Sequence, residues 1–419
     1  MIKGPKGAPD ILPDKSKSIR VIIDKIIKIV ENFSYEEIIL PIFEHSEVFE
    51  RTVGEDTDIV EKEMYTFFDK SGRKLSLRPE GTAQTVRAYL ENNLKTLTQP
   101  VKLFYFGPMF RYERPQKGRF RQFFHFGIEA LGDEKPELDV EVISISLQIL
   151  ESLGLKDLSV SLNSIGDIEE RNVYKEKLKS FLRTRYLELC DDCKKRVEKN
   201  PLRVLDCKKE SCINVTKDAP KIIDYLSNES KNHFEKILSM LDDLKIKYEI
   251  NNRLVRGLDY YNRTVFEVFS SDLGAQNAVL GGGRYDYLSE YLGGDRVPGV
   301  GFAMGVERLI MILETKNLLP KNEKNIIFIS PLSKEYFEET FKFYIYLGKS
   351  DFSVYFPYNF KNIKTSISNA LKMNIDYMII YGGDELKNGF LIFKDLKKEE
   401  QQLIKIENLS NFLNNYGGL

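Results

Sequence analysis

The feature that most constrains the fold of this chain is residues 104–132, which read FYFGPMFRYERPQKGRFRQFFHFGIEALG. Two aromatic-rich runs, of the kind that favours β-strands, flank a turn at 115–118 that holds a proline and a glycine. The segment therefore predicts a β-hairpin with a strongly positive tip, suited to holding phosphates. The cations that gather near the turn are Arg111, Arg114, Lys117, Arg119 and Arg121.

The second arm of this hairpin alternates in character. A strand repeats every two residues, so one face would carry Phe124, Phe126, Ile128 and Ala130 and the other Phe123, His125, Gly127 and Glu129. The first face is predicted to be core and the second to carry chemistry. A charged, solvated turn on an ordinary core hairpin is the alternative interpretation of the cation cluster alone.

Composition sets broad limits on the class of protein. A length of 419 residues suggests two or three domains, and hydrophobic and charged fractions of 42% and 30% are ordinary for a globular protein. We find no apolar run of the roughly 18 residues that a membrane span needs, and no secretory signal, so a cytoplasmic protein is expected. A net charge of -1 excludes a generally basic nucleic-acid coat but leaves room for a local RNA site.

Hydrophobic spacing predicts helices over 16–33 and 138–153, a strand pair near 64–77 and strands at 255–269 and 278–283. A lysine- and glutamate-rich segment at about 166–245 is mostly helical in pattern and looks inserted. After the Leu319-Pro320 break, strands at 326–330, 354–358 and 377–382 alternate with helical segments. This rhythm indicates a separate small α/β domain.

All four cysteines of the chain lie inside the inserted segment, as Cys190, Cys193, Cys207 and Cys212. The first pair has the two-residue gap usual for zinc ligands, but the second has a four-residue gap, and no histidine lies between them. Reduced structural thiols are therefore the favoured interpretation, and a zinc site is the alternative.

Four segments resemble the sequence motifs of class II aminoacyl-tRNA synthetases, and of histidyl-tRNA synthetases in particular. The hairpin resembles motif 2, residues 41–67 followed by LRPEGTA at 77–83 resemble motif 1 and its extension, and 299–313, GVGFAMGVERLIMIL, resemble motif 3. Residues 252–268, NRLVRGLDYYNRTVFEV, resemble the signature peculiar to histidyl-tRNA synthetases. The motifs occur in the family's order and run nearly from end to end.

The resemblance implies an α+β fold. Residues 1–324 would form a class II catalytic domain, with an antiparallel sheet of the six-stranded type, flanking helices and the helical insertion at about 166–245. Residues 325–419 would form an α/β anticodon-binding domain.

The reaction that the resemblance implies begins with attack of a histidine carboxylate on the α-phosphate of ATP. Negative charge meets negative charge in this step, so fixed cations are needed, whereas no general base is needed because the carboxylate is already ionised. The family pattern assigns the catalytic cation to Arg256, phosphate contacts to Arg111, Arg119 and Arg308, and adenine contacts to Glu113 and Phe123.

For histidine itself, the resemblance implies contacts with the α-amino end from Glu80, Gly81, Thr82 and the position of His125, and with the imidazole from Glu129 and Tyr261 beside Tyr260. Paired aromatics in a strand are the alternative interpretation of the two tyrosines. The family normally has glutamine where this chain has His125. With an ordinary pKa near 6.5, that imidazole is expected to become charged at low pH. Histidine binding should therefore weaken more below this pH in the wild type than in a His125→Gln variant.

The implied substrates and partners are ATP with Mg²⁺, L-histidine and tRNA(His), with no organic cofactor, no membrane partner and a homodimer built on motif 1. Arg114 and Gln116 would meet the acceptor end of the tRNA, and the C-terminal domain would stack anticodon bases on Tyr355, Phe356 or Tyr358. Two alternatives share the fold: a regulatory subunit of histidine biosynthesis, and a synthetase-derived scaffold or sensor. The RGLDYY signature and the C-terminal domain disfavour the first, and the intact arginine set disfavours the second.

Overall fold

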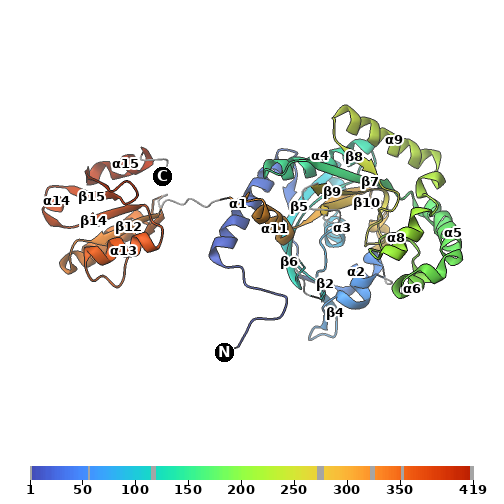
Figure 1. Cartoon of the computed structure of the whole chain (residues 1–419), viewed down its shortest axis with the longest axis horizontal. Coiled ribbons are helices and arrows are strands. Elements are labelled where there is room, and N and C mark those ends of the chain that lie inside the picture. The colour runs from blue at the N-terminus through green and yellow to red at the C-terminus, as the bar shows by residue number, and fades with distance from the viewer. Residues whose placement is uncertain are drawn as a thin grey trace. The chain divides into compact units, whose positions relative to one another are not determined.

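The computed structural model describes residues 2–54, 57–114, 119–270, 278–320, 326–350 and 353–415. The chain divides into two compact units, Met1–Pro320 and Lys321–Leu419, each with its own sheet (Figure 1). The boundary that the sequence predicts, between residues 324 and 325, lies in a stretch outside the described residues.

The first unit is built on an eight-stranded sheet in the order β1-β5-β6-β11-β10-β9-β7-β8. Six consecutive strands, from β5 to β7, pair antiparallel, and the two short edge strands β1 and β8 pair parallel. The expected antiparallel fold is therefore confirmed, with two parallel edge strands added. The strands are β1 Glu36–Glu37, β5 Val101–Phe110, β6 Gln122–Leu131, β7 Leu158–Ser164, β8 Tyr248–Ile250, β9 Asn262–Ser270, β10 Ala278–Arg284 and β11 Gly299–Gly305.

The predicted hairpin is formed by β5 and β6, which pair in register from Val101 opposite Leu131 to Phe110 opposite Gln122. Side chains on β6 alternate as expected, because Phe126, Ile128 and Ala130 are fully buried in the main hydrophobic core. The residues between them therefore face the other side of the sheet.

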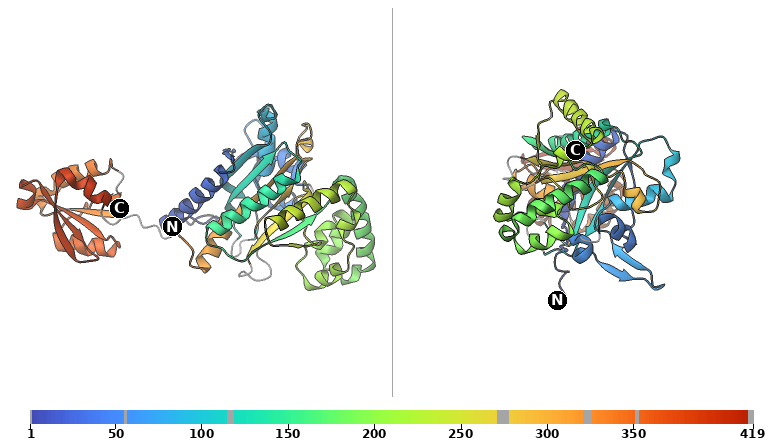
Figure 2. Two further views of the ribbon diagram at one scale, coloured as in Figure 1. Left: turned by 90° about the horizontal axis from the view of Figure 1, so that it is seen from above. Right: turned by 90° about the vertical axis from the view of Figure 1, so that its right-hand side faces the viewer.

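Helices cover the core face of the sheet. Apolar side chains of α1 Pro13–Glu31, α4 Pro136–Ser152, α9 Asn228–Asp243 and α11 Val306–Thr315 join those of β6, β7, β9 and β11 in one buried cluster. Figure 2 shows α1 and α4 running across this side of the unit. The expected helices at 16–33 and 138–153 are thus present, with slightly shifted ends.

The opposite face carries a second buried cluster, which joins α3 Thr82–Glu91 to the inserted segment. The insertion is helical, as predicted, and consists mainly of α5 Ile168–Thr184, α6 Asp191–Lys199, α7 Leu202–Leu205, α8 Glu210–Lys217 and α9. Figures 1 and 2 show the helices α5 to α8 as a lobe at one end of the unit. Their core includes Leu254, Val255, Tyr260 and Tyr261, so it is continuous with the signature segment.

Three smaller elements complete this unit. A three-stranded sheet contains β2 Phe43–His45, β4 Lys74–Leu77 and β3 Thr66–Phe68 in that order, next to α2 Ser46–Val53. It includes the expected strand pair, with Gly72 at a φ of 77° in the turn between β3 and β4. A short helix, α10 Leu288–Tyr291, follows β10.

One predicted strand is too long. The spacing predicts a strand over 255–269, but β9 begins only at Asn262, and residues 251–261 form a loop. Gly257 lies in this loop, and Arg171 of α5 donates a hydrogen bond to the carbonyl oxygen of Asp259 at 3.3 Å and another to that of Tyr261. Tertiary hydrogen bonds thus replace the ladder that a local pattern predicts.

The second unit has a five-stranded sheet in the order β13-β12-β14-β15-β16. Its first three strands pair in parallel, as the βαβ rhythm predicts, whereas β15 and β16 add an antiparallel hairpin that we did not predict. The elements are β12 Ile326–Pro331, α12 Phe337–Leu347, β13 Ser353–Tyr355, α13 Ile363–Lys372, β14 Tyr377–Tyr381, α14 Gly383–Lys387, β15 Phe390–Asp395, β16 Glu400–Lys405 and α15 Leu409–Asn415. Among the described residues of both units, no helix is long and apolar enough to cross a membrane.

Candidate active site

A cavity of about 370 Å³ in the first unit brings together most of the residues expected to bind substrates. Its walls come from the loop before α3, the β5–β6 hairpin, the 251–261 loop, β10 and the start of α11. The predicted site residues that line it are Glu80, Thr82, Arg111, Glu113, Arg119, Phe123, His125, Arg256, Tyr260, Tyr261 and Arg308.

Three predicted residues that the structure describes do not line the cavity, and a fourth is not described. Glu129 is buried behind the lining, and a Cβ on Gly81 would stand 2.4 Å from the ring of Tyr105, so this glycine allows close packing rather than facing the cavity. Arg114 is exposed on the hairpin, and Gln116 lies outside the described residues.

Arg256 comes from the signature loop and lies over β10. Its guanidinium pairs with the carboxylate of Glu267 on β9 and lies 5.9 Å from the ring centre of Tyr261. Burial alone would lower the pKa of Arg256, but the charge of Glu267 and the hydroxyls of Tyr261 and Tyr260 raise it above the ordinary value. The group is therefore a permanent, oriented cation. Glu267 lines the cavity and was not among the predicted residues.

Arg111 and Arg119 flank the turn of the hairpin. Nε of Arg111 donates to the carbonyl oxygen of Pro79 at 3.0 Å, and its guanidinium lies 5.5 Å from the ring centre of Phe123. Arg119 pairs with Glu113 at 3.1 Å. Arg111 is thus fixed by a backbone carbonyl, whereas the contact of Arg119 with Glu113 is an exposed ion pair.

Arg308 lies in the first turn of α11, next to Glu307. Both carboxylate oxygens of Glu307 accept from the backbone N–H of Phe124, at 3.0 and 2.9 Å, which ties α11 to β6. Burial lowers the pKa of Arg308, and the charge of Arg119 acts in the same direction. A second arginine charge close by makes this end of the cavity strongly attractive to an anion.

Glu80 fixes the start of α3. Its carboxylate accepts from the backbone N–H groups of Thr82 at 2.6 Å and Ala83 at 2.9 Å, which have no partner within the helix. Burial nevertheless raises the pKa of Glu80, and the two backbone hydrogen bonds oppose that shift. The loop LRPEGTA is therefore rigid where it borders the cavity.

Glu129 lies at the centre of a buried hydrogen-bond network. Oε1 contacts the hydroxyl of Thr82 at 2.6 Å and that of Tyr105 at 3.4 Å, and Oε2 contacts the hydroxyl of Tyr285. Burial raises the pKa of Glu129 to about 8, although the hydrogen bonds from Thr82 and Tyr285 oppose the shift. This carboxyl is therefore mostly protonated at pH 7. The contact of Tyr285 with Glu129 was not predicted, because no sequence pattern near the glycine-rich strand links the two residues.

His125 is half-buried on the cavity wall, and its ring lies 5.0 Å from that of Phe123. Burial and the charges of Arg111 and Arg78 lower the pKa of His125 to about 3. The expectation that it charges near pH 6.5 is therefore wrong, because desolvation and two cations oppose a third positive charge. Nδ1 is buried and has no hydrogen-bond partner among the described residues.

The chain matches two family models in sequence order. The model of histidyl-tRNA synthetase matches residues 7–309, and that of the anticodon binding domain matches residues 326–416. The chain belongs to the histidyl-tRNA synthetase family. It is a histidine–tRNA ligase of class II, which activates L-histidine with ATP to histidyl-adenylate and transfers it to the 3′ end of tRNA(His).

Relatives cover almost the whole length of this histidyl-tRNA synthetase family member. It is 47% identical over 409 residues to the histidine–tRNA ligase of Halothermothrix orenii, a match that covers 97% of this chain and 98% of the other. Identity to the enzyme of Acetivibrio thermocellus is 44% over 410 residues, or 98% of each chain. The crystal structure of the apo histidyl-tRNA synthetase of S. aureus superimposes with a TM-score of 0.83 at 36% identity and covers 98% of this chain and 99% of that one.

The glycine-rich end of β10 in this synthetase-family unit packs closely against β11 as well as bordering the cavity. A Cβ on Gly282 would stand 2.1 Å from the carbonyl oxygen of Gly301 on β11. Arg284, which follows, is fully buried and pairs with Asp139 of α4 and, at 3.1 Å, with Asp286. Two of the three glycines nevertheless border site residues, because a Cβ on Gly281 would meet Arg256 and one on Gly283 would stand 2.9 Å from the ring of Tyr261.

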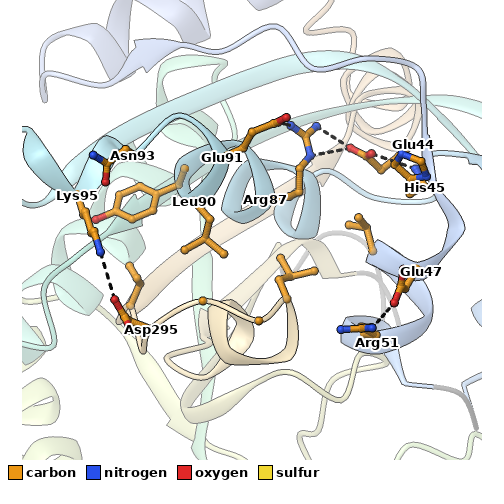
Figure 3. A pocket seen from close by; sticks show the side chains of 16 residues that line it. Glu44, His45, Glu47, Arg51, Arg87, Leu90, Glu91, Asn93, Lys95 and Asp295 are labelled. Atoms are coloured by element: carbon orange, nitrogen blue, oxygen red, sulfur yellow. Dashed lines mark hydrogen bonds and ion pairs between the residues drawn. The ribbon is translucent and has the colours of Figure 1, made fainter.

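A larger cleft, of about 760 Å³, lies between α2, α3 and the loop after α10 in the same histidyl-tRNA synthetase unit (Figure 3). Its charged side chains are engaged with one another: Arg51 with Glu47, Arg87 with Glu44 and Glu91, and Lys95 with Asp295. Neutralised pairs offer little attraction to a triphosphate. In the smaller cavity Arg256 and Arg119 are also paired, with Glu267 and Glu113, but most of the predicted site residues line it, so this cavity is the candidate for adenylation.

Proposed function

We propose that the 370 Å³ cavity is the adenylation site and that Arg256 and Arg111 stabilise the charge on the α-phosphate. The observation that carries this proposal is the convergence of four guanidinium groups on one cavity. Nε of Arg256 is buried and has no hydrogen-bond partner among the described residues, so it can donate to a ligand oxygen. The guanidinium groups belong to Arg111, Arg119, Arg256 and Arg308.

In the proposed reaction, a carboxylate oxygen of histidine attacks the α-phosphorus, and the bond to the bridging oxygen of pyrophosphate breaks. Negative charge grows on the non-bridging oxygens in the transition state, where Arg256 and Arg111 are already in place and need not reorganise. Arg308 and Arg119 neutralise the departing pyrophosphate. No side chain has to accept a proton in this step.

Adenine is proposed to stack on Phe123, with its amino group donating to Glu113. Because Glu113 pairs with Arg119, ATP binding would exchange that exposed pair for two ligand contacts. ATP is used as its Mg²⁺ complex. The carboxylates of Glu113 and Glu267 line the same cavity, and carboxylate oxygens are the protein ligands that Mg²⁺ prefers.

Histidine is proposed to bind with its α-ammonium group beside Glu80, Thr82 and His125. A neutral imidazole with an unpartnered buried Nδ1 can accept a hydrogen bond from this group, which an imidazolium cannot. The side chain of histidine would reach towards Tyr261 and the network of Glu129. Thr82 and Tyr285 hydrogen-bond to Glu129 in this network. A pocket that also hydrogen-bonds the imidazole would reject an analogue without a polar ring, because that contact would be left unmade.

The hairpin tip and the second unit are proposed to bind the tRNA. Arg114 is exposed and close in sequence to Arg111, which lines the cavity. It is proposed, with Gln116, to meet the 3′ end of the tRNA. In the second unit, Tyr358 is 68% exposed and Tyr355 38%, so both can stack on anticodon bases. Phe356 is 1% exposed and packs against Phe337, so the expectation that it stacks on RNA is wrong.

A homodimer is proposed through motif 1. The stretch from the end of β1 to β2 and the neighbouring strand β3 expose large apolar side chains, which a partner surface would cover. Light scattering of the purified chain tests this directly, since a monomer at micromolar concentration would exclude it. The side chains are Ile39, Ile42, Phe43, Phe67 and Phe68.

Histidine-dependent ATP–pyrophosphate exchange tests the site. Arg256→Gln is expected to lower kcat by about 100-fold or more, as removal of a preorganised charge contact does. The matched control is Arg183→Gln, which removes an exposed ion pair with Glu198 on the insertion. Unchanged exchange in Arg256→Gln, or an equal loss in the control, would contradict the proposed role.

A further inference from the structure

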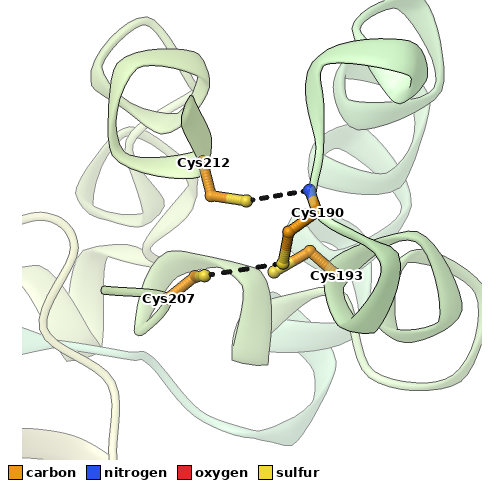
Figure 4. A group of neighbouring side chains, drawn as sticks. All are labelled: Cys190, Cys193, Cys207 and Cys212. Atoms are coloured by element: carbon orange, nitrogen blue, oxygen red, sulfur yellow. Dashed lines mark hydrogen bonds between the residues drawn. The ribbon is translucent and has the colours of Figure 1, made fainter. Parts of the chain in front are cut away.

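The four cysteines, separated by up to 22 positions in sequence, meet at one point of the insertion (Figure 4). Cys190 directly precedes α6, Cys193 lies in its first turn, Cys207 lies between α7 and α8, and Cys212 lies on α8. Their sulfur atoms all lie within 4.8 Å of one another. Three of the side chains are buried and Cys190 is half-buried.

This geometry fits a tetrahedral metal ion. A zinc ion bound by four thiolates has Zn–S distances of about 2.3 Å, which places its sulfurs about 3.8 Å apart. The Sγ atoms of Cys190 and Cys207 are 3.9 Å apart, well beyond the roughly 2.05 Å of a disulfide. The four-residue gap of the second pair is no obstacle, because α8 begins at Glu210 and brings Cys212 back towards Cys207.

The surroundings suit a site of net charge −2, which four thiolates and one Zn²⁺ would produce. Between Cys190 and Cys212 the chain has seven lysines and arginines against five acidic residues, an excess of two positive charges. The backbone N–H of Cys190 also donates to Sγ of Cys212 at 3.3 Å, an interaction that favours a thiolate. Four neutral thiols without a metal would gain little from the positive surroundings or from the N–H donor.

We propose that Cys190, Cys193, Cys207 and Cys212 bind one Zn²⁺ as a structural site. Zn²⁺ would replace the four thiol protons, which leave to solvent, and no oxidant or reductant takes part. A site with four protein ligands has no open position, so the ion would hold the fold rather than take part in chemistry. The ion ties the start of α6 to the turn between α7 and α8.

The same turn supports the loop that carries Arg256. Arg253 donates to the carbonyl oxygens of Leu205 at 3.0 Å and Cys207 at 3.4 Å, and Arg203 donates to that of Gly257 at 2.9 Å. The metal site therefore helps to position the loop that carries Arg256, because Arg253 of that loop donates to the backbone carbonyl of the ligand Cys207. This consequence rests on the proposed role of Arg256, whereas the metal itself does not.

Metal analysis of the full chain, purified without chelators, tests the site. We expect about one zinc per chain, released when an organomercurial modifies the thiols, and a Co²⁺-substituted protein with intense thiolate-to-cobalt absorption. Cys190→Ser, at the least buried ligand, is expected to lose most of the zinc. Asp191→Asn, on an almost fully exposed neighbour between two ligands, is expected to keep it.

Three results would overturn the metal site: a folded wild-type chain with four titratable thiols and no metal, a disulfide found by mass spectrometry, or stoichiometric iron in place of zinc. Zinc-depleted wild-type protein is further expected to lose about tenfold or more in histidine-dependent exchange and to regain it with added Zn²⁺, because small displacements of a positioned group are costly. Full activity without the metal would refute the positioning role alone, since the metal content is measured separately.

Discussion

The guanidinium of Arg256 occupies space that only the bare backbone of Gly281 leaves open. A Cβ on residue 281 would stand 2.5 Å from Nη1 and 2.7 Å from Cζ of Arg256. The obstructed group is the end of a flexible side chain, so a methyl group at 281 would displace the arginine rather than break the strand. Glu267, the partner of Gly281 in the pairing of β9 with β10, holds the guanidinium by an ion pair.

Gly281→Ala is therefore expected to lower the kcat of histidine-dependent exchange by about 10- to 100-fold while the melting temperature changes little. Gly257→Ala is the matched control, since a Cβ there would meet only Nη1 of Arg203, at 3.9 Å. Exchange kinetics and thermal unfolding of the two variants check this. A large loss of stability with a normal kcat in the folded fraction would contradict the steric argument.

His125 is expected to leave the pH dependence of histidine binding unchanged. With its pKa lowered to about 3 by burial, Arg111 and Arg78, the imidazole stays neutral from pH 5.5 to 8 in the folded chain. The Michaelis constant for histidine in the wild type and in His125→Gln should thus vary in parallel over this range. A wild-type constant that rises more steeply below pH 6.5 would restore the interpretation from sequence.

The same residue predicts a difference in folding stability. The unfolded chain takes up a proton at this position near pH 6.5 and the folded chain does not, so stability is lost as pH falls below that value. Denaturant unfolding at pH 7.5 and 5.5 should therefore show a larger loss for the wild type than for His125→Gln.

Glu129 should give the opposite slope. Its folded pKa, about 8, lies above that of an unfolded glutamate, so its contribution to stability is complete below about pH 4.5 and is lost as pH rises through 8. Between pH 5 and 8 the wild type should lose more unfolding free energy than Glu129→Gln, by up to a few kcal/mol. Equal slopes in urea titrations at the two pH values would show that the carboxyl ionises normally.

Sequence patterns predicted the features of the site that depend on neighbouring residues of the chain. The period of two placed Phe123 and His125 on one face of β6, because a strand fixes these directions along the chain. Arg111 and Arg256 lie far apart in sequence, and only the family resemblance assigned them to one site. The pKa of His125 could not be predicted in the same way. That pKa depends in part on Arg78, which belongs to another segment of the chain, so the alternation along β6 gives no sign of it.

Partners distant in sequence were missed for the same reason. Tyr285 meets Glu129 across 156 positions, and Glu267 reaches Arg256 only because residues 251–261 leave the strand that their pattern predicts. The metal-binding potential of the cysteines was predicted from their spacing alone. That spacing does not show how α6 and α7 fold the 13 residues between Cys193 and Cys207 so that the two pairs meet. These contacts are decided by tertiary packing, so a single sequence carries no signal for them.

Tyr285→Phe is expected to raise the Michaelis constant for histidine several-fold and to destabilise the chain by about 1–3 kcal/mol, because Oε2 of buried Glu129 loses its donor. Tyr287→Phe is the control, since it removes a similar hydroxyl two residues away that does not contact Glu129 in the described structure. Steady-state kinetics and chemical denaturation separate the two effects. Identical behaviour of the two variants would remove Tyr285 from the histidine network.

Tyr358 offers a way to separate the two halves of the reaction. It is exposed in the second unit, so Tyr358→Ala should remove a stacking surface worth about 1–3 kcal/mol per base without unfolding the unit. Exchange without tRNA should stay normal, whereas the Michaelis constant for tRNA(His) in aminoacylation should rise about 5- to 100-fold. Phe356→Ala, which empties a core position, should instead destabilise the whole unit. If Tyr358→Ala aminoacylates with a normal Michaelis constant, the anticodon is bound elsewhere on the unit.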